Sequence, residues 1–567
     1  FVRKLRDNNI PIGRVCSILG VHGSESAIPI HKEVDNIKDD IGKTMSLLDN
    51  MKTNDVGMEI LFKLDDDGKI KSMLLCTGKN RADYAKFGDV VTFDTTYRTN
   101  LYNLPFGLFV GVNNHFQSIV FGGVLLTNEK IEYFEWVFTK FTELMVGKVP
   151  LTILTDQCQA MAAAIKSVFP TSNHRWCWWH VLRKTKQKVG PAYSKKSNFK
   201  KEFNKLVTEE TVVNRFERRW RQLIRKYNLT DNQFLIRIFK HRAKWAKPYF
   251  MGIFCAGMTS TQRSESANHM LKQFIQRWAP MHMFVRKFNE FQMDCCDQED
   301  KEAHVTKQFR WKHRVGVPIE RHAEVIYTRR IYEKFYNELY YAGAHAIKST
   351  NAVGSFDVVH SSYDGDPDQA CYKVVYVDGD KVSCDCGFFD HVGLLCRHSL
   401  KVLVHLDVKE IPKNNRTARW MKNVDESTDC SHFIFGLDSI PGTYDVLKKR
   451  TLVNRVLEVV YAPEPIMDDL YSQVMWAIDR SRSIASLHHK PVGHLNTVVG
   501  ISGSRGHESI CAQPHIKCPD RPTKTGRPPN TSLQSWREEQ KRNTCESTDE
   551  ENPRGGKTHL ISDVLSL

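Results

Sequence analysis

Short apolar runs bounded by turn-forming residues dominate the chain between residue 86 and about residue 126. β-branched and aromatic residues fill VVTFDTTY from Val90, FGLFVGVNN from Phe106 and SIVFGGVLL from Ser118. Asn103 and Asn113 lie in the stretches that separate these runs. Alternation of this kind, with Asn and Pro between the runs, predicts a meander of three strands.

The spacing of the apolar residues then changes to that of a helix. In EYFEWVFTKFTELM, from Glu132, they recur every three or four positions. LTILT from Leu151 predicts a fourth strand, QAMAAAIKSVF from Gln159 a second helix, and HRWCWW from His174 a fifth strand. The order β-β-β-α-β-α-β predicts an α/β fold in which helices pack on one sheet.

Shifts in composition divide the 567 residues into five segments. We expect residues 1–85 to be helical and polar, and residues 426–487 to be helical. Residues 488–567, rich in Gly, Ser, Pro, Thr and charge, are expected to be a disordered basic tail. The remaining segments are an α/β core at 86–345, with a basic helical insertion at about 181–255, and a region of short strands and clustered cysteines at 355–425. The first residue, Phe1, suggests that the chain is a fragment whose N-terminus is missing.

Composition narrows the classes of function. The net charge of +16 and a pI near 9.1 favour a polyanionic partner, either nucleic acid or an anionic membrane. The longest apolar runs are far shorter than the ~20 residues of a membrane-spanning helix. The fifteen cysteines are mostly scattered, which is unlike a secreted disulfide framework and fits the reducing cytosol or nucleus.

Three acids lie where strands end or a helix begins. Asp94 ends the first strand of the meander, Asp156 ends the fourth strand, and Glu265 lies at the start of a predicted helix. Two Asp and one Glu can hold two Mg²⁺ ions for phosphodiester cleavage and strand transfer. A single Asp at a strand end is more often a cap or turn residue, so spacing alone does not assign this chemistry.

Three segments carry a family resemblance. FGDVVTFDTTYRTN from Phe87, LTDQCQAMAAAIKSVFPTSNHRWCWWHV from Leu154 and AGMTSTQRSESANHM from Ala256 resemble Mutator-like element transposases. More closely, they resemble the plant far-red-impaired-response family of transcription factors derived from such transposases. The resemblance extends in one collinear order over about residues 1–425.

The resemblance implies a ribonuclease-H-like core with a helical insertion between the second Asp and the Glu. Asp94, Asp156 and Glu265 fall on the positions of the catalytic triad. The family's second acid after TDQ is replaced here by Cys158. One carboxylate fewer weakens the attraction for a metal ion, so the retained triad does not establish cleavage.

Cys177 and His180 fall on the family's Cys-x-x-His motif. Two residues three positions apart could supply two zinc ligands, but no second pair is evident in the sequence. The alternative is a buried structural cysteine beside a hydrogen-bonded histidine.

A dense Cys/His cluster follows in CDCGFFDHVGLLCRH. Cys384, Cys386, Cys396 and His398 form a C-x-C-x₉-C-x-H pattern. Three thiolates and one imidazole are a tetrahedral set for structural Zn²⁺. The pattern resembles a SWIM-type zinc finger, and His391 is interpreted as a spare loop residue.

Basic residues gather in the insertion and recur in the tail. Arg218, Arg221 and Arg225 share one predicted helix face, which could neutralise phosphates or could simply be solvated. The candidate nucleic-acid contacts are Lys195, Lys196, Lys200, Lys201, Arg218, Arg221, Arg225 and Arg527. Arg527 lies in the segment GRPPN, which is either similar to an AT-hook or a plain linker.

The resemblance implies a nuclear, zinc-binding regulator of transcription that uses its core as a scaffold. Its expected partners are DNA, other transcription regulators and a second chain in a homo- or heterodimer, with no membrane. An active transposase that cuts and joins DNA with Mg²⁺ is the alternative, and a protein-binding adaptor is the third class. The expected cofactors are structural Zn²⁺ and, in the alternative, Mg²⁺ at the acidic triad.

Overall fold

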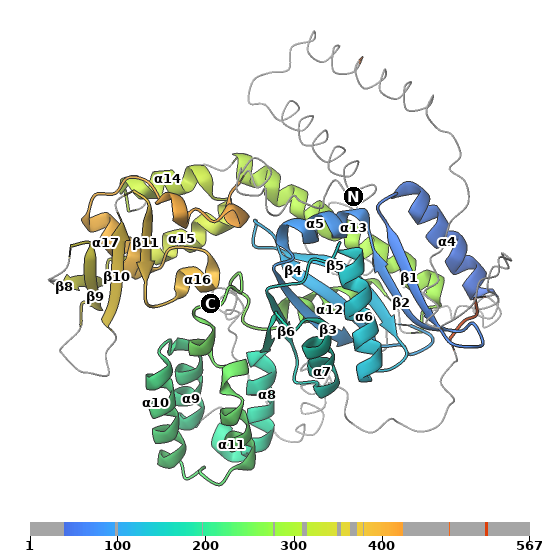
Figure 1. The fold of residues 1–567 in the computed structure, drawn as a ribbon, viewed down its shortest axis with the longest axis horizontal. Helices are drawn as coiled ribbons and strands as arrows, with labels where there is room; N and C mark the ends of the chain where they lie inside the picture. The colour runs from blue at the N-terminus through green and yellow to red at the C-terminus, as the bar shows by residue number, and fades with distance from the viewer. Residues whose placement is uncertain are drawn as a thin grey trace, which may run out of the picture. The chain divides into compact units, whose positions relative to one another are not determined.

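Seven strands pair into one mixed sheet (Figure 1). The computed structural model describes residues 39–422 except 97–99, 195–196, 276–277, 309–314, 349–352, 363–370 and 378, together with 476 and 516–519. The strands are β1 (Glu59–Leu64), β2 (Ile70–Cys76), β3 (Val90–Thr96), β4 (Phe106–Val112), β5 (Ser118–Leu126), β6 (Thr152–Thr155) and β7 (Asn173–Trp176). Their order across the sheet is β1-β2-β5-β4-β3-β6-β7.

The predicted meander and the two strands after it are confirmed. β3, β4 and β5 pair antiparallel, whereas β6 and β7 continue the sheet parallel to β3. In the β3–β6 register Thr92 lies opposite Leu154. Asp94 and Asp156 each stand two residues further on, so both acids reach the same edge of the sheet.

Helices cover both faces of the sheet because its strands alternate between two apolar clusters. Phe106, Leu108 and Val110 of β4 pack against α4 (Asp40–Asn54), α12 (Gln262–Phe274) and α13 (Met281–Gln308). Phe109 faces the other side with α5 (Gly78–Phe87), α6 (Ile131–Leu144) and α7 (Gln159–Val168). Gly107 is required on that side, because a Cβ there would lie 2.6 Å from the Phe93 ring. The predicted α/β class, with helices on a mixed sheet, is confirmed.

The N-terminal segment differs from the prediction. Residues 1–85 were expected to be helical, yet β1 and β2 form an antiparallel hairpin that extends the sheet beyond β5. Asp65 turns the chain by accepting hydrogen bonds from Gly68 N and Lys69 N. The run from Ile70 to Cys76 is almost wholly buried. The burial of its side chains in the sheet favours a strand there, although the flanking residues are polar.

The insertion forms a helical unit with its own aromatic core. It comprises α8 (Trp178–Val189), η1 (Gly190–Tyr193), α9 (Asn198–Glu209), α10 (Val213–Lys226), α11 (Gln233–Lys240), η2 (Arg242–Lys244) and η3 (Lys247–Phe250). Phe203, Phe216, Trp220 and Trp245 pack together at its centre.

A second, four-stranded antiparallel sheet follows in the order β11-β10-β9-β8. Its strands are β8 (His345–Lys348), β9 (Ser355–His360), β10 (Cys371–Val377) and β11 (Lys381–Cys384). The helices around it are α14 (Pro318–Ile326), α15 (Arg329–Ala342), α16 (Phe388–Val392), α17 (Arg397–His405), η4 (Lys413–Asn415) and η5 (Ala418–Trp420). Val90, Val112 and Leu154 of the first sheet share one apolar cluster with Leu394, Leu400 and Trp420.

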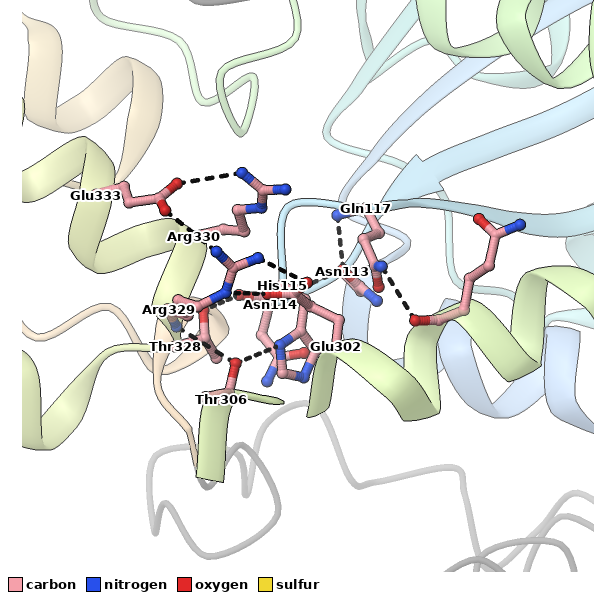
Figure 2. A network of polar contacts seen from close by, with 11 residues as sticks. Asn113, Asn114, His115, Gln117, Glu302, Thr306, Thr328, Arg329, Arg330 and Glu333 are labelled. Atoms are coloured by element: carbon pink, nitrogen blue, oxygen red, sulfur yellow. Dashed lines mark hydrogen bonds and ion pairs between the residues drawn. The ribbon is translucent and has the colours of Figure 1, made fainter. Parts of the chain in front are cut away.

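A polar network fixes the start of α15 on the core (Figure 2). Thr328 Oγ1 donates to the carbonyl of Asn114 in the β4–β5 turn, at 2.6 Å. Arg329 forms a two-pronged ion pair with Glu302 of α13, with both N···O distances at 2.9 Å. The helix that leads into the second sheet therefore begins at a fixed point on the first.

Two predicted segments lie outside the described residues. These are the helical stretch at 426–487, apart from Trp476, and the tail at 488–567, apart from 516–519. Within those four residues Lys517 pairs with Lys69, so this part of the expected disordered tail is ordered. Among the described helices, none has the length and apolar character needed to cross a membrane.

A buried ion pair joins the segment after the second sheet to the first sheet, and it yields a stability prediction. Arg419 contacts the Asp89 carboxylate and donates to the carbonyls of Phe87 and Val112. Arg419→Ala leaves Asp89 buried without its guanidinium, so we expect a loss of about 3–5 kcal/mol in unfolding free energy. Urea denaturation of the full chain measures it. Arg416→Ala, which removes a more exposed pair with Glu410, is the control and should cost at most about 1 kcal/mol.

Candidate functional site

Three predicted acids gather where β3 and β6 end. Asp94 was expected to end its strand, but β3 continues for two more residues to Thr96. Asp94 is buried and accepts a hydrogen bond from Asn268 Nδ2 of α12, at 3.2 Å. Asp156 follows β6 and accepts from the backbone N–H of Cys158, at 2.8 Å. Glu265 lies in the first turn of α12 and accepts from Thr261 Oγ1, at 3.0 Å. The parallel pairing and the return of the chain after the insertion bring the three together.

Burial and mutual repulsion push these carboxyls toward their neutral forms. Burial raises the pKa of Asp94 well above its usual value, and the nearby charges of Glu265 and Asp156 raise it further. Burial also raises the pKa of Asp156 and of Glu265. Burial and the neighbouring negative charges therefore favour the neutral form of these carboxyls while no cation is bound.

A fourth carboxylate, Glu129, was missed from the sequence. It follows β5 and accepts a hydrogen bond from Thr95 Oγ1, at 2.5 Å. Its charge contributes to the raised pKa of both Asp94 and Asp156. Strand direction could have indicated this position. The first and third strands of a meander run in the same direction, so the residues that follow both strands lie at the same edge of the sheet.

The acids do not close into a compact metal cage. Two groups of described side chains have ligand atoms that all lie within 4.8 Å of one another, and the set Asp94, Asp156 and Glu265 is not one of them. The structure therefore gives no support for Mg²⁺ at the predicted triad.

The CWWH turn holds the segment that precedes Glu265. Cys177 caps α8, and its Sγ accepts from the backbone N–H of Thr261, at 3.2 Å. Trp178 Nε1 donates to Thr259 Oγ1, at 3.1 Å. His180 is buried, and its Nε2 lies 3.7 Å from Glu265 Oε1. The Cys-x-x-His motif and Glu265 are thus neighbours, although His180 and Glu265 are 85 positions apart in the sequence.

The finger brings its four predicted ligands together. Cys384 ends β11, Cys386 lies in the following turn, and Cys396 and His398 stand at the start of α17. Their ligand atoms all lie within 4.8 Å of one another. The two Cys-x-Cys and Cys-x-His claws therefore come from a strand end and a helix N-terminus.

The donor set of the finger fits Zn²⁺. Burial raises the pKa of the Cys396 thiol, but hydrogen bonds from Cys384, Cys386 and His398 outweigh this effect and lower the pKa well below its usual value. Hydrogen bonds within the cluster, together with burial, raise the pKa of Cys384 and of Cys386, so these shifts belong to the three thiols together. The thiolate is the form that binds zinc. Three sulfurs and one nitrogen fill a tetrahedral shell and exclude water.

His391 has a different role from the spare loop residue that was expected. It is buried in α16, and its Nδ1 lies 3.0 Å from the carbonyl of Phe250 and 3.1 Å from that of Ile253. Its own carbonyl accepts from Cys255 N, at 2.9 Å. Gly387 approaches the same segment so closely that a Cβ would lie 2.2 Å from the Met251 carbonyl oxygen. The finger therefore docks on the chain between the insertion and α12.

The predicted basic face is present on α10 and partly neutralised. Arg218, Arg221 and Arg225 are exposed, while Phe216 and Trp220 face the core of the insertion. Arg221 forms an ion pair with Glu217. Of the other predicted contacts, Lys201 is exposed, Lys200 is half-buried, and Lys195, Lys196 and Arg527 lie outside the described residues.

Comparison with known proteins agrees with both the sheet core and the Cys/His finger. A MULE transposase domain matches residues 90–184, and a SWIM zinc finger matches residues 372–407. Protein FAR1-RELATED SEQUENCE 5 of Arabidopsis thaliana is 32% identical over 375 residues, which cover 64% of this chain and 46% of the relative. Protein FAR-RED IMPAIRED RESPONSE 1 of the same plant is 29% identical over 364 residues, covering 64% of this chain and 43% of the relative.

A third relative, Protein FAR1-RELATED SEQUENCE 11 of Arabidopsis thaliana, is 30% identical over 383 residues, covering 67% of this chain and 55% of the relative. The chain spans about half the length of these relatives. The matched transposase domain contains β3 to β7, and the matched finger contains the Cys/His cluster. The chain belongs to the FAR1-related family of proteins derived from Mutator-like transposases and carrying a SWIM zinc finger.

Proposed function

We propose that this chain is a nuclear, zinc-binding, DNA-associated regulator of transcription that has lost transposition activity. The observation that carries the proposal is the contrast between its two predicted centres. The Cys384/Cys386/Cys396/His398 cluster has the donors and spacing of a structural zinc site, whereas the ligand atoms of the three acids do not all lie within 4.8 Å of one another. A transposase-derived core can keep its fold and serve as a scaffold, because a fold alone does not fix a function.

DNA contact is assigned to the exposed face of α10. Arg218, Arg221 and Arg225 project from one side of a helix whose other side is fixed in an aromatic core. A row of guanidinium groups on one helix face can neutralise the phosphates of a duplex and reads no sequence. Net charge +16 supports the same polyanionic partner.

The finger is assigned a structural role in presenting this scaffold to its partners. Because α16 docks on residues 250–255, zinc binding stabilises the segment between the insertion and α12 as well as the finger itself. The proposed protein partners are other transcription regulators and a second chain of the same family in a dimer.

Loss of a finger ligand tests the zinc assignment. Cys396→Ser removes a buried thiolate, so the purified chain should lose about one equivalent of zinc by elemental mass spectrometry. Its thermal transition should also move to a lower temperature, because metal binding contributes to folding. Cys371→Ser, at an exposed cysteine on neighbouring β10, is the matched control and should keep the wild-type zinc content. Unchanged zinc in Cys396→Ser would refute the assignment.

Salt dependence tests the DNA contact. In Arg218→Gln/Arg221→Gln/Arg225→Gln we expect weaker binding to any duplex, and a log Kd against log salt slope that falls by about 0.9 for each phosphate that the variant no longer neutralises. Fluorescence anisotropy at several salt concentrations measures both. Arg321→Gln, an exposed arginine on α14, is the control. An unchanged slope in the triple variant would place the DNA contact elsewhere or favour the protein-binding adaptor.

A cleavage assay separates the regulator from the transposase. With supercoiled DNA carrying Mutator-like ends and either Mg²⁺ or Mn²⁺, we expect no nicking or strand transfer above background. The reason is that Cys158 stands where the family has a further acid after TDQ, which leaves one carboxylate fewer to attract a metal ion. Cleavage by the wild-type chain that disappears in Asp156→Asn would establish the transposase instead.

A further inference from the structure

The Cys-x-x-His turn at the start of α8 has a third potential ligand that the sequence did not reveal. Cys177, His180 and Glu265 each offer one ligand atom, and these atoms all lie within 4.8 Å of one another. The first two come from the junction of β7 and α8, and the third comes from the first turn of α12. No residue of this group belongs to the finger.

Thr261 orients all three side chains. Its backbone N–H donates to Cys177 Sγ, and its hydroxyl donates to Glu265 Oε1, at 3.2 and 3.0 Å. The same hydroxyl oxygen lies 3.5 Å from His180 Nδ1 and can accept its proton. With Nδ1 engaged in this way, Nε2 carries the lone pair and is the atom that faces Glu265. An outer partner that fixes the tautomer and angle of a histidine is typical of metal sites.

The spacing suits a shared metal ion better than a direct contact. His180 Nε2 and Glu265 Oε1 are 3.7 Å apart, which is too long for a hydrogen bond. Two ligands bound to one tetrahedral zinc at about 2.0–2.1 Å are roughly 3.3 Å apart, so a small inward movement would complete the site.

The ligand atoms indicate which metal the site would bind and whether a coordination position stays open. A thiolate and an imidazole favour Zn²⁺ over Mg²⁺, which prefers oxygen ligands. Three protein ligands leave the fourth position of a tetrahedral ion open. Cys177 and His180 are buried, whereas the Glu265 side chain is 29% exposed, so water reaches the cluster from the carboxylate side.

We propose that Cys177, His180 and Glu265 bind a second Zn²⁺ ion, separate from the zinc of the finger and with one coordination position open to solvent. Zinc there would occupy the Glu265 carboxylate and tie the base of the insertion to α12. Glu265 would then be unavailable to a Mg²⁺ ion at the sheet edge.

The zinc content of the 567-residue chain tests this proposal. Wild type should hold about two zinc ions per chain, and Cys177→Ser and His180→Gln about one, with the finger intact. Cys396→Ser should retain about one, and Cys177→Ser/Cys396→Ser should retain none. Cys296→Ser, at a half-buried cysteine of α13, is the control and should match wild type. A wild-type content of one that disappears in Cys396→Ser would overturn the second site.

X-ray absorption at the zinc edge keeps the test decisive if Cys177→Ser fails to fold. The zinc that remains in Cys396→Ser should have a single sulfur neighbour, from Cys177. Two sulfur neighbours would place that zinc in the damaged finger, between Cys384 and Cys386, and would refute the proposal. The two zinc ions are counted separately. If the second zinc is absent, the regulator proposal is unaffected, and if the finger zinc is absent, the proposal of a zinc site at Cys177, His180 and Glu265 is unaffected.

Discussion

The arrangement of both centres depends on how the chain returns from the insertion to the sheet. Residues 250–261 are held on one side by the finger, through His391 and the carbonyls of Phe250 and Ile253. On the other side Thr152 Oγ1 donates to the Phe254 carbonyl, and the CWWH turn binds Thr259 and Thr261. These contacts offset the entropy of closing a long loop. They place Glu265 beside Asp94 at the end of β3.

The finger is therefore part of the scaffold and not an appendage to it. Trp420 and Leu394, from the segments around the finger, share an apolar cluster with Val90 and Leu154 of the first sheet. Arg419 adds a buried ion pair to Asp89. The helices α16 and α17, which adjoin the Cys/His cluster, thus belong to the same body as the acids and the sheet.

Local sequence features predicted the parts whose partners are near in sequence. The short runs of β-branched and aromatic residues at Val90–Thr96 and Phe106–Val112 predicted strands because turn-forming residues bound them. The C-x-C and C-x-H claws predicted the zinc ligands because each claw is three residues long. Asp94 and Asp156 could be placed at one edge from strand order alone. The hairpin of β1 and β2 was missed, because its single buried run reads as a strand only when a sheet edge is there to pair with it.

By itself, then, the sequence predicted the succession of elements from Val90 to Trp176, the basic insertion and the Cys/His pattern of the finger, since these follow from periodicity and short spacings. Only the tertiary structure decided which distant side chains meet. Glu129 lies at the acidic edge of the sheet, and His391 is the residue through which the finger docks. Cys177 and His180 lie beside Glu265. The physical reason is that each of these contacts joins segments far apart along the chain, and their approach is fixed by packing and hydrogen bonding of the whole body.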